Sequence, residues 1–298
     1  MPNGIILLDK PRGLTSNGAL QRVRKAFGAR SAGHVGTLDP MATGMLPLCL
    51  DEATKVIAEI ESGAKCYVFT VQLGARTNTG DAEGEVVERM PVPVLDAAHI
   101  EQVLRGFRGL QTQIPPMYSA LKRAGRPLYE LARQGIEVER APRTLEIRRL
   151  ELDAIRSDAL ELTCECTKGT YVRVLGEDIA RMLGTLGHLT ALRRSWVEPF
   201  REKPMVSLEE ALAGAATTQN LLPPDVALQG LPMARLTGEQ TACLRHGQVV
   251  EHVVGGQTHD APGTRVRAYG PAGEFLGLAE VLDDGRLQPR RLMAASAS

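Results

Sequence analysis

The sequence has few of the features that mark disulfide-stabilised, metal-binding or membrane-spanning proteins. It holds five cysteines, an odd number, and only Cys164 and Cys166 lie close together. No second pair of cysteines or histidines completes a zinc site, so we expect reduced cysteines that pack as small apolar side chains. No run approaches the roughly 20 apolar residues that a membrane helix needs. The start, Met-Pro-Asn-Gly, has no basic lead, so we expect a cytoplasmic protein without a signal peptide.

The chain also lacks a net charge, because 35 lysines and arginines balance 35 acids. Taken alone, this neutral balance argues against nucleic-acid binding. The charges are nevertheless segregated. Basic residues gather in 22–30 and 122–149, and acids gather in 51–61 and 81–88. Such segregation either gives one basic face for phosphates or reflects ordinary solvated helix faces.

Hydrophobic periodicity predicts an α+β fold with a mixed, largely antiparallel sheet. Apolar or alternating runs over 5–8, 66–73 and 160–166 are typical of strands, and 169–175 leads into a helix. Helical faces are also predicted, one after a cap at Thr15 or Ser16 and one in a later segment. Their apolar residues are Leu20, Val23 and Phe27 in the first helix, and Ile100, Val103, Leu104 and Phe107 in the second.

A change of texture near 221–226 predicts a domain boundary. We expect a large domain over 1–228, with an insertion at about 123–143, and a small β-barrel over 231–293. Residues 294–298 are expected to form a disordered tail. The strand-like runs of the small domain are 248–254, 264–269 and 275–281.

The most informative segment is Gly-His-Val-Gly-Thr-Leu-Asp-Pro-Met-Ala-Thr-Gly-Met-Leu-Pro, residues 33–47, with Asp39 at its centre. Pro40 disfavours helical geometry at Asp39, and the surrounding glycines permit close backbone approaches. By spacing alone, a structural turn in which the carboxylate bonds backbone amides is the commoner interpretation. The alternative is a rigid loop that aims one carboxylate at a substrate.

The whole segment resembles the active-site motif of the TruB family, bacterial synthases that make pseudouridine at uridine 55 in the T loop of tRNA. The resemblance implies a pseudouridine-synthase catalytic domain followed by a PUA-like RNA-binding domain. It implies an isomerisation without redox cofactor, metal or cosubstrate, in which the target base is flipped out of the RNA. Asp39 matches the catalytic aspartate, a nucleophile towards sugar or base, or a base that removes a sugar proton.

The same resemblance assigns further residues near Asp39. Tyr67, on the strand over 66–73, is expected to stack on the flipped uracil and to take the C5 proton; the alternative is a core aromatic. Tyr171 and Arg173, in Lys-Gly-Thr-Tyr-Val-Arg, are two apart and would share a face on a strand. Tyr171 would line the uridine pocket. Arg173 would pair with Asp39 and keep it ionised.

Four other positions have supporting or binding roles in the family. His34 and Leu192 match substrate-binding positions, His34 for displaced T-loop nucleotides and Leu192 for the pocket wall. Asp81 matches an acid near the active site, and Lys10, with Pro11, matches a motif that braces the catalytic loop. The basic insertion resembles an RNA-gripping element, with Pro127 starting and Gly135 ending a short helix.

We therefore expect a monomer that binds the tRNA T arm directly, without a guide RNA, a metal or a membrane. A guide-dependent synthase is a second interpretation, against which the long basic insertion argues. A third is a tRNA-folding chaperone whose activity is independent of catalysis, since the insertion and the small domain would serve either role.

Overall fold

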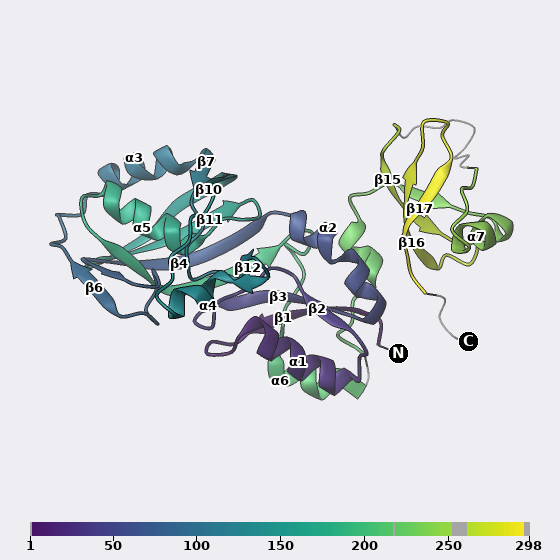
Figure 1. Ribbon diagram of the computed structural model, residues 1–298, viewed down its shortest axis with the longest axis horizontal. Coiled ribbons are helices and arrows are strands. Elements are labelled where there is room, and N and C mark those ends of the chain that lie inside the picture. The colour runs from purple at the N-terminus through teal and green to yellow at the C-terminus, as the bar shows by residue number, and fades with distance from the viewer. Residues whose placement is uncertain (1, 217, 252–260, 295–298) are drawn as a thin grey trace.

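The computed structural model describes residues 2–216, 218–251 and 261–294. A large domain built on one extended sheet lies beside a smaller C-terminal sheet domain (Figure 1). In the described residues, the large sheet follows the order β13-β1-β3-β12-β4-β11-β10-β7, with β2 paired to β3. Its strands are β1 (Gly4–Lys10), β2 (Ala32–His34), β3 (Thr43–Leu50), β4 (Lys65–Leu73), β7 (Gly109–Gln113), β10 (Arg143–Arg156), β11 (Ala159–Cys166), β12 (Gly187–Val197) and β13 (Val206–Ser207).

The pairing confirms a mixed, largely antiparallel sheet. Within the large sheet, β1 with β13 and β3 with β12 are parallel, and the other pairs are antiparallel. The α-helices of the large domain outside the insertion are α1 (Ser16–Phe27), α2 (Ile57–Ser62), α3 (Ala97–Phe107), α5 (Val172–Met182) and α6 (Leu208–Ala213). Shorter elements are the 3₁₀ turns η1 (Asp51–Val56), η2 (Gly214–Ala216) and η3 (Pro224–Leu228), and strands β5 (Ala75–Thr77) and β6 (Val86–Arg89).

Helix α1 follows the predicted local rules. The Thr15 side chain accepts from Gly18 N at 2.9 Å and so caps the helix. Ser16, the other predicted cap, instead turns inward toward the Asp39 loop. The chain leaves the helix at Gly28, whose φ of +61° is the left-handed conformation that glycine adopts most readily.

The sheet is buried on both faces where β1 and β3 run, because alternate side chains enter two separate cores. Ile6 and Leu8 join the larger core, and Ile5 and Leu7 join the core beneath α2 and η3. This explains why β1 is an unbroken apolar run rather than an alternating one. On β4, Phe69 and its odd-numbered neighbours face the larger core beneath α5.

The insertion forms a small substructure of its own. It contains the two-stranded pair β8 (Lys122–Arg123) and β9 (Arg126–Pro127), followed by helix α4 (Leu128–Arg133). Pro127 stands at the N-cap of α4, and Gly135 follows its end with a φ of +71°. The predicted start and end of this helix therefore match the structure.

The C-terminal domain contains β14 (Met233–Arg235), α7 (Gly238–Arg245), β15 (Arg265–Tyr269), β16 (Phe275–Val281) and β17 (Leu287–Leu292). It confirms the predicted small β domain. Within the described residues its strands pair in the open order β14-β15-β16-β17, so a closed barrel is not formed by these pairs. Of the predicted run over 248–254, Val250 makes one bridge to Leu287, and residues 252–254 lie outside the described residues, as do 295–298 of the predicted tail.

Direct contacts join the two domains. Leu278 of β16 enters the core beneath α2. Lys55 Nζ donates to Leu292 O at 2.7 Å, and Tyr269 OH donates to Asp225 Oδ2 at 2.8 Å. The described helices include none with the length and apolar character needed to cross a membrane.

Replacing Phe69 tests the core of the large domain. Phe69 is 1% exposed, so F69A should lower the free energy of unfolding by about 3–5 kcal/mol through lost burial and the cavity left behind. The neighbouring V68A, at a side chain that is 40% exposed, should cost less than about 1 kcal/mol. Urea unfolding, followed by the fluorescence of the single tryptophan, Trp196, measures both. Equal losses in the two variants would contradict this view of the β4 core.

Candidate active site

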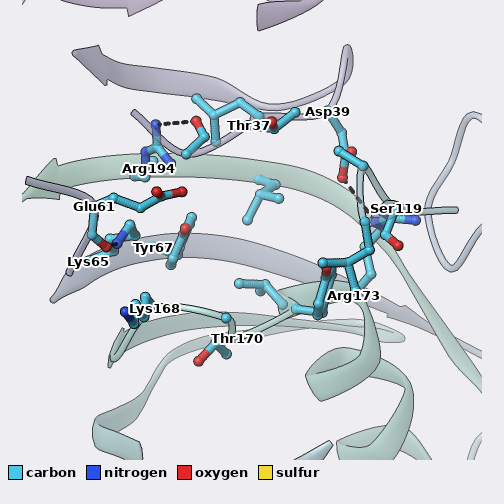
Figure 2. A pocket seen from close by; sticks show the side chains of 18 of the residues that line it. Thr37, Asp39, Glu61, Lys65, Tyr67, Ser119, Lys168, Thr170, Arg173 and Arg194 are labelled. Carbon is cyan, nitrogen blue, oxygen red and sulfur yellow. Dashed lines mark hydrogen bonds and ion pairs between the residues drawn. The ribbon is translucent and has the colours of Figure 1, made fainter. Parts of the chain in front are cut away.

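A cavity of about 670 Å³ opens where β4, β12, α5 and the loop that carries Asp39 meet. Figure 2 shows Asp39 and Arg173 at one end of this cavity and Tyr67, Lys65 and Arg194 at the other. Of the residues singled out in the sequence, Asp39, Tyr67, Tyr171, Arg173 and Leu192 all line it. The cavity is thus lined by segments that are far apart in the sequence, among them the loop that carries Asp39, β4, the start of α5 and β12.

The Asp39 loop, residues 35–42, is held in place by the start of α1. The Ser16 hydroxyl donates to Leu38 O at 2.9 Å and accepts from Leu38 N at 2.8 Å. Gly13 N donates to Pro40 O at 2.7 Å. The backbone does turn at Asp39, whose carbonyl accepts from Ala42 N, but its carboxylate is directed to an arginine.

Asp39 and Arg173 form an ion pair, with 3.0 Å between Oδ2 and Nε. Arg173 is buried and also donates to Thr79 O at 2.7 Å and to Tyr118 O at 2.6 Å. The Asp39 side chain keeps 34% of its surface exposed, toward the cavity. Burial removes water from the Asp39 carboxylate and so raises its pKa; the Arg173 charge opposes that rise, and the Asp81 charge adds to it.

Arg173 and Tyr171 reach the cavity from a helix, so the expectation of a shared strand face is wrong. Strand β11 ends at Cys166, and Gly169, with a φ of +87°, turns the chain into α5. Tyr171 is the N-cap of α5, and Arg173 stands in its first turn. The Gln113 side chain fixes this start, since it accepts from Tyr171 N at 3.0 Å and donates to Tyr171 O at 3.4 Å.

Tyr67 faces the cavity from β4 and is 8% exposed. Burial raises its pKa to about 12, and the nearby charge of Arg194 opposes the rise. Its phenol is therefore protonated at neutral pH. Leu192 of β12, also 8% exposed, completes the apolar part of the wall. A flat base between these two side chains would be shielded from water.

Lys10, the last residue of β1, contacts the Asp39 loop. It is fully buried, and its Nζ donates to Leu14 O at 2.6 Å, to Pro11 O at 2.9 Å and to Pro40 O at 3.4 Å. Burial lowers its pKa to about 8, while the Asp39 carboxylate favours the charged form. Lys10 thus links the Asp39 loop, at Pro40, to the segment that leads into α1, at Pro11 and Leu14.

Asp81 and His34 stand apart from the cavity. Asp81 Oδ2 lies 3.7 Å from Arg173 Nε, and its Oδ1 accepts from the Thr79 hydroxyl and from Glu83 N. His34 ends β2, and it is not among the described residues that line the cavity. Its pKa is lowered by burial and by the Arg194 charge.

The cavity also contains charged residues that sequence reasoning missed, chiefly Lys65 and Arg194. Lys65 is buried, and its Nζ donates to Glu61 O at 2.9 Å and to Gly63 O at 2.8 Å. Strand alternation was the available signal, because it places Lys65 on the face of Tyr67 and Arg194 on the face of Leu192. In the described segments no group of three or more His, Cys, Asp or Glu side chains is arranged to hold a metal ion.

Comparison with solved structures supports the fold. The chain is 25% identical to a chain of a crystal structure of a Cbf5–Nop10–Gar1 complex, with a TM-score of 0.72, covering 94% of this chain and 79% of that one. A structure of an H/ACA RNP bound to a substrate RNA containing 2′-deoxyuridine shares the fold, with a TM-score of 0.73 at 20% identity, covering 98% and 86%.

Family models match in three consecutive stretches. The N-terminal domain of TruB family pseudouridylate synthases matches residues 24–172, the tRNA pseudouridylate synthase B C-terminal domain matches 173–229, and the pseudouridine synthase II TruB C-terminal model matches 232–293. The fold and these matches define a pseudouridylate synthase.

Curated relatives narrow the class further. tRNA pseudouridine synthase B of Aromatoleum aromaticum is 48% identical over 298 residues, covering 99% of this chain and 94% of that protein. The same enzyme of Stutzerimonas stutzeri is also 48% identical, covering 98% and 95%. The chain belongs to the TruB family.

Replacing Lys10 tests the lowered lysine pKa. Because the folded-state value, about 8, lies below the ordinary 10.5, the unfolded chain binds more protons between these values. The stability of the wild type should therefore rise with pH, by about 2 kcal/mol relative to K10M between about pH 7.5 and about pH 9.5. Urea unfolding at both pH values measures this, with K25M on the exposed face of α1 as control. A pH slope shared by the wild type and K10M would contradict it.

Proposed function

We propose that the protein isomerises uridine 55 in the T loop of tRNA to pseudouridine. The observation that carries the proposal is the Asp39 carboxylate, held at 3.0 Å by Arg173 and open to a cavity lined by Tyr67 and Leu192. A carboxylate that stays ionised beside a partly apolar pocket suits attack on a base or sugar. The names of the relatives support tRNA as the substrate.

The reaction breaks the N1–C1′ bond of uridine, turns the released uracil and joins its C5 to C1′. The proton on C5 is lost and N1 gains one, so no atom is added or removed overall. Asp39 starts the reaction, either as the nucleophile that adds to C1′ or to the base, or as the base that removes a sugar proton. No oxidant, reductant or cosubstrate is required by this balance.

The neighbouring residues have distinct roles in this proposal. Arg173 keeps Asp39 ionised, because its charge opposes the rise in pKa that burial of the carboxylate causes. Tyr67 receives the flipped uracil and replaces stacking worth about 1–3 kcal/mol per base. Late in the reaction the phenol oxygen of Tyr67 takes the proton from C5 while its own hydroxyl proton passes to water, and N1 is protonated from water. Tyr171 and Leu192 close the pocket around the ring.

Recognition of the RNA falls to the basic surface outside the cavity. In the insertion, Arg123, Arg126 and Arg133 are exposed. Arg143 lines the cavity itself. Arginines there suit the phosphates of a folded T arm, which is recognised by shape before the base is flipped. We propose direct action in the cytoplasm as a monomer, without a guide RNA, and a modest contact from the C-terminal domain.

Replacing Asp39 tests the proposed function. D39N keeps the shape of the side chain but removes the carboxylate, so pseudouridine formation at position 55 of unmodified tRNA should fall by more than about 10³-fold. Purified protein and bare tRNA are incubated, and pseudouridine is mapped by chemical modification and primer extension. D153N, at an exposed position of β10, is the matched control and should retain wild-type activity.

Normal product from D39N would overturn the assignment of Asp39. Loss of product together with unchanged rescue of misfolded tRNA would show that a chaperone activity exists beside the catalytic one. Wild-type protein that needs an added guide RNA would contradict direct recognition.

The pH profile tests the electrostatics of the ion pair. The pKa of Asp39 is raised from its ordinary 3.8, so the acid limb of kcat/KM should have its midpoint above that value. Asp81 contributes to the rise, and D81N should therefore move the midpoint to lower pH. Single-turnover rates across the acid range measure this in both proteins. An upward shift in D81N would contradict the assigned charge coupling.

A further inference from the structure

Arg194 is a buried arginine in the cavity wall whose guanidinium donates to backbone carbonyls. Only 1% of its surface is exposed. Across the described part of the chain it forms no ion pair with an Asp or Glu side chain, although buried guanidinium groups usually do. Its Nε donates to Met45 O at 2.7 Å, and its Nη2 donates to Val35 O and Gly36 O at 3.0 and 3.2 Å. Backbone carbonyls therefore satisfy the charge.

These carbonyls stand on both sides of Asp39. Val35 and Gly36 open the Asp39 loop, and Met45 lies on β3 just after it. The backbone of Arg194 also touches the closing end, since a Cβ added at Gly44 would lie 2.2 Å from Arg194 O. One residue thus fixes both ends of the loop. The planar guanidinium suits this task, because its donors project in fixed directions.

The Arg194 guanidinium lies at the end of the cavity opposite the ion pair of Asp39 and Arg173 (Figure 2). Arg194 pairs directly with Tyr67 across β12 and β4, and Figure 2 shows the two side chains at one end of the cavity. Arg194 also approaches Gly36 closely, because a Cβ there would lie 2.9 Å from Arg194 Nη1. Its charge acts on its surroundings, opposing the rise in the pKa of Tyr67 and lowering that of His34.

We propose that Arg194 is a positioning residue for pseudouridine formation, which fixes both ends of the Asp39 loop and sets the place of Tyr67 relative to it. This deepens the proposed function and rests on it. A merely structural arginine would contribute to stability alone. A positioning arginine sets the turnover of bound RNA and the order of the loop, and a lysine of the same charge cannot replace its fork of donors.

The experiment compares R194Q and R194K with R193Q. Arg193 is adjacent on β12 but points away, to an ion pair with Asp9 at 2.7 Å, and its side chain is 43% exposed. We expect R193Q to behave as wild type. In R194Q and R194K, kcat on unmodified tRNA should fall by about 100-fold through misplacement of Asp39, with KM changed less than about threefold.

Two further readouts do not depend on activity. Hydrogen exchange should be faster in both Arg194 variants than in R193Q at two amides of the Asp39 loop, that of Leu38, which donates to the Ser16 hydroxyl, and that of Ala42, which donates to Asp39 O. NMR titration of His34 should show its pKa raised in R194Q and near wild type in R194K. Glu61 acts on the same imidazole in the opposite sense and is unchanged in all variants.

The outcomes separate the proposals. Wild-type kcat in either Arg194 variant, a loss confined to KM, or unchanged loop exchange would overturn the positioning role. Should R194Q fail to fold, R194K decides the question, because it keeps the positive charge and lacks the fork of donors. Wild-type protein inactive on tRNA would reject the proposed function, and loop exchange would still test the contacts of Arg194.

Discussion

The ion pair between Asp39 and Arg173 is the constraint on which the rest of the site depends. A carboxylate that has lost part of its hydration tends to take up a proton, and the buried guanidinium of Arg173 at 3.0 Å opposes that tendency. Arg173 can do this because two backbone carbonyls, of Thr79 and Tyr118, hold its remaining donors. The Asp39 loop must in turn be rigid, which explains the contacts from Ser16 and Lys10 around it.

Local patterns in the sequence were sufficient where neighbouring residues decide the structure. Strand β4 was predictable from alternation, and α1 from its Thr15 cap and apolar face, because both effects act within a few residues. The Asp39 motif identified the site, since a long specific resemblance carries more information than the spacing of one Asp-Pro pair. The roles assigned to the site residues, those of His34 and Asp81 outside the cavity included, stay predictions.

The features that escaped prediction depend on residues distant in the chain. The spacing of Tyr171 and Arg173 fits a strand, but Gln113, from β7, holds the backbone at Tyr171 where a helix begins. Buried cations are the second case. Lysine and arginine are usually surface residues, so the sequence gives no sign that Lys65 and Arg194 are buried. Only the folded chain supplies the backbone carbonyls that accept their hydrogen bonds and make burial tolerable.

The order of strands in the large sheet has a consequence for how the chain is made. Strand β12, residues 187–197, lies between β3 and β4 and is hydrogen-bonded to both. Before β12 is made, neither β3 nor β4 has the strand that covers this edge in the complete fold. Such edges are prone to wrong pairing, so the ribosome-bound chain is most vulnerable to aggregation just before its central strand emerges. Asp39 and Tyr67, made early, become one site only when that late strand joins them.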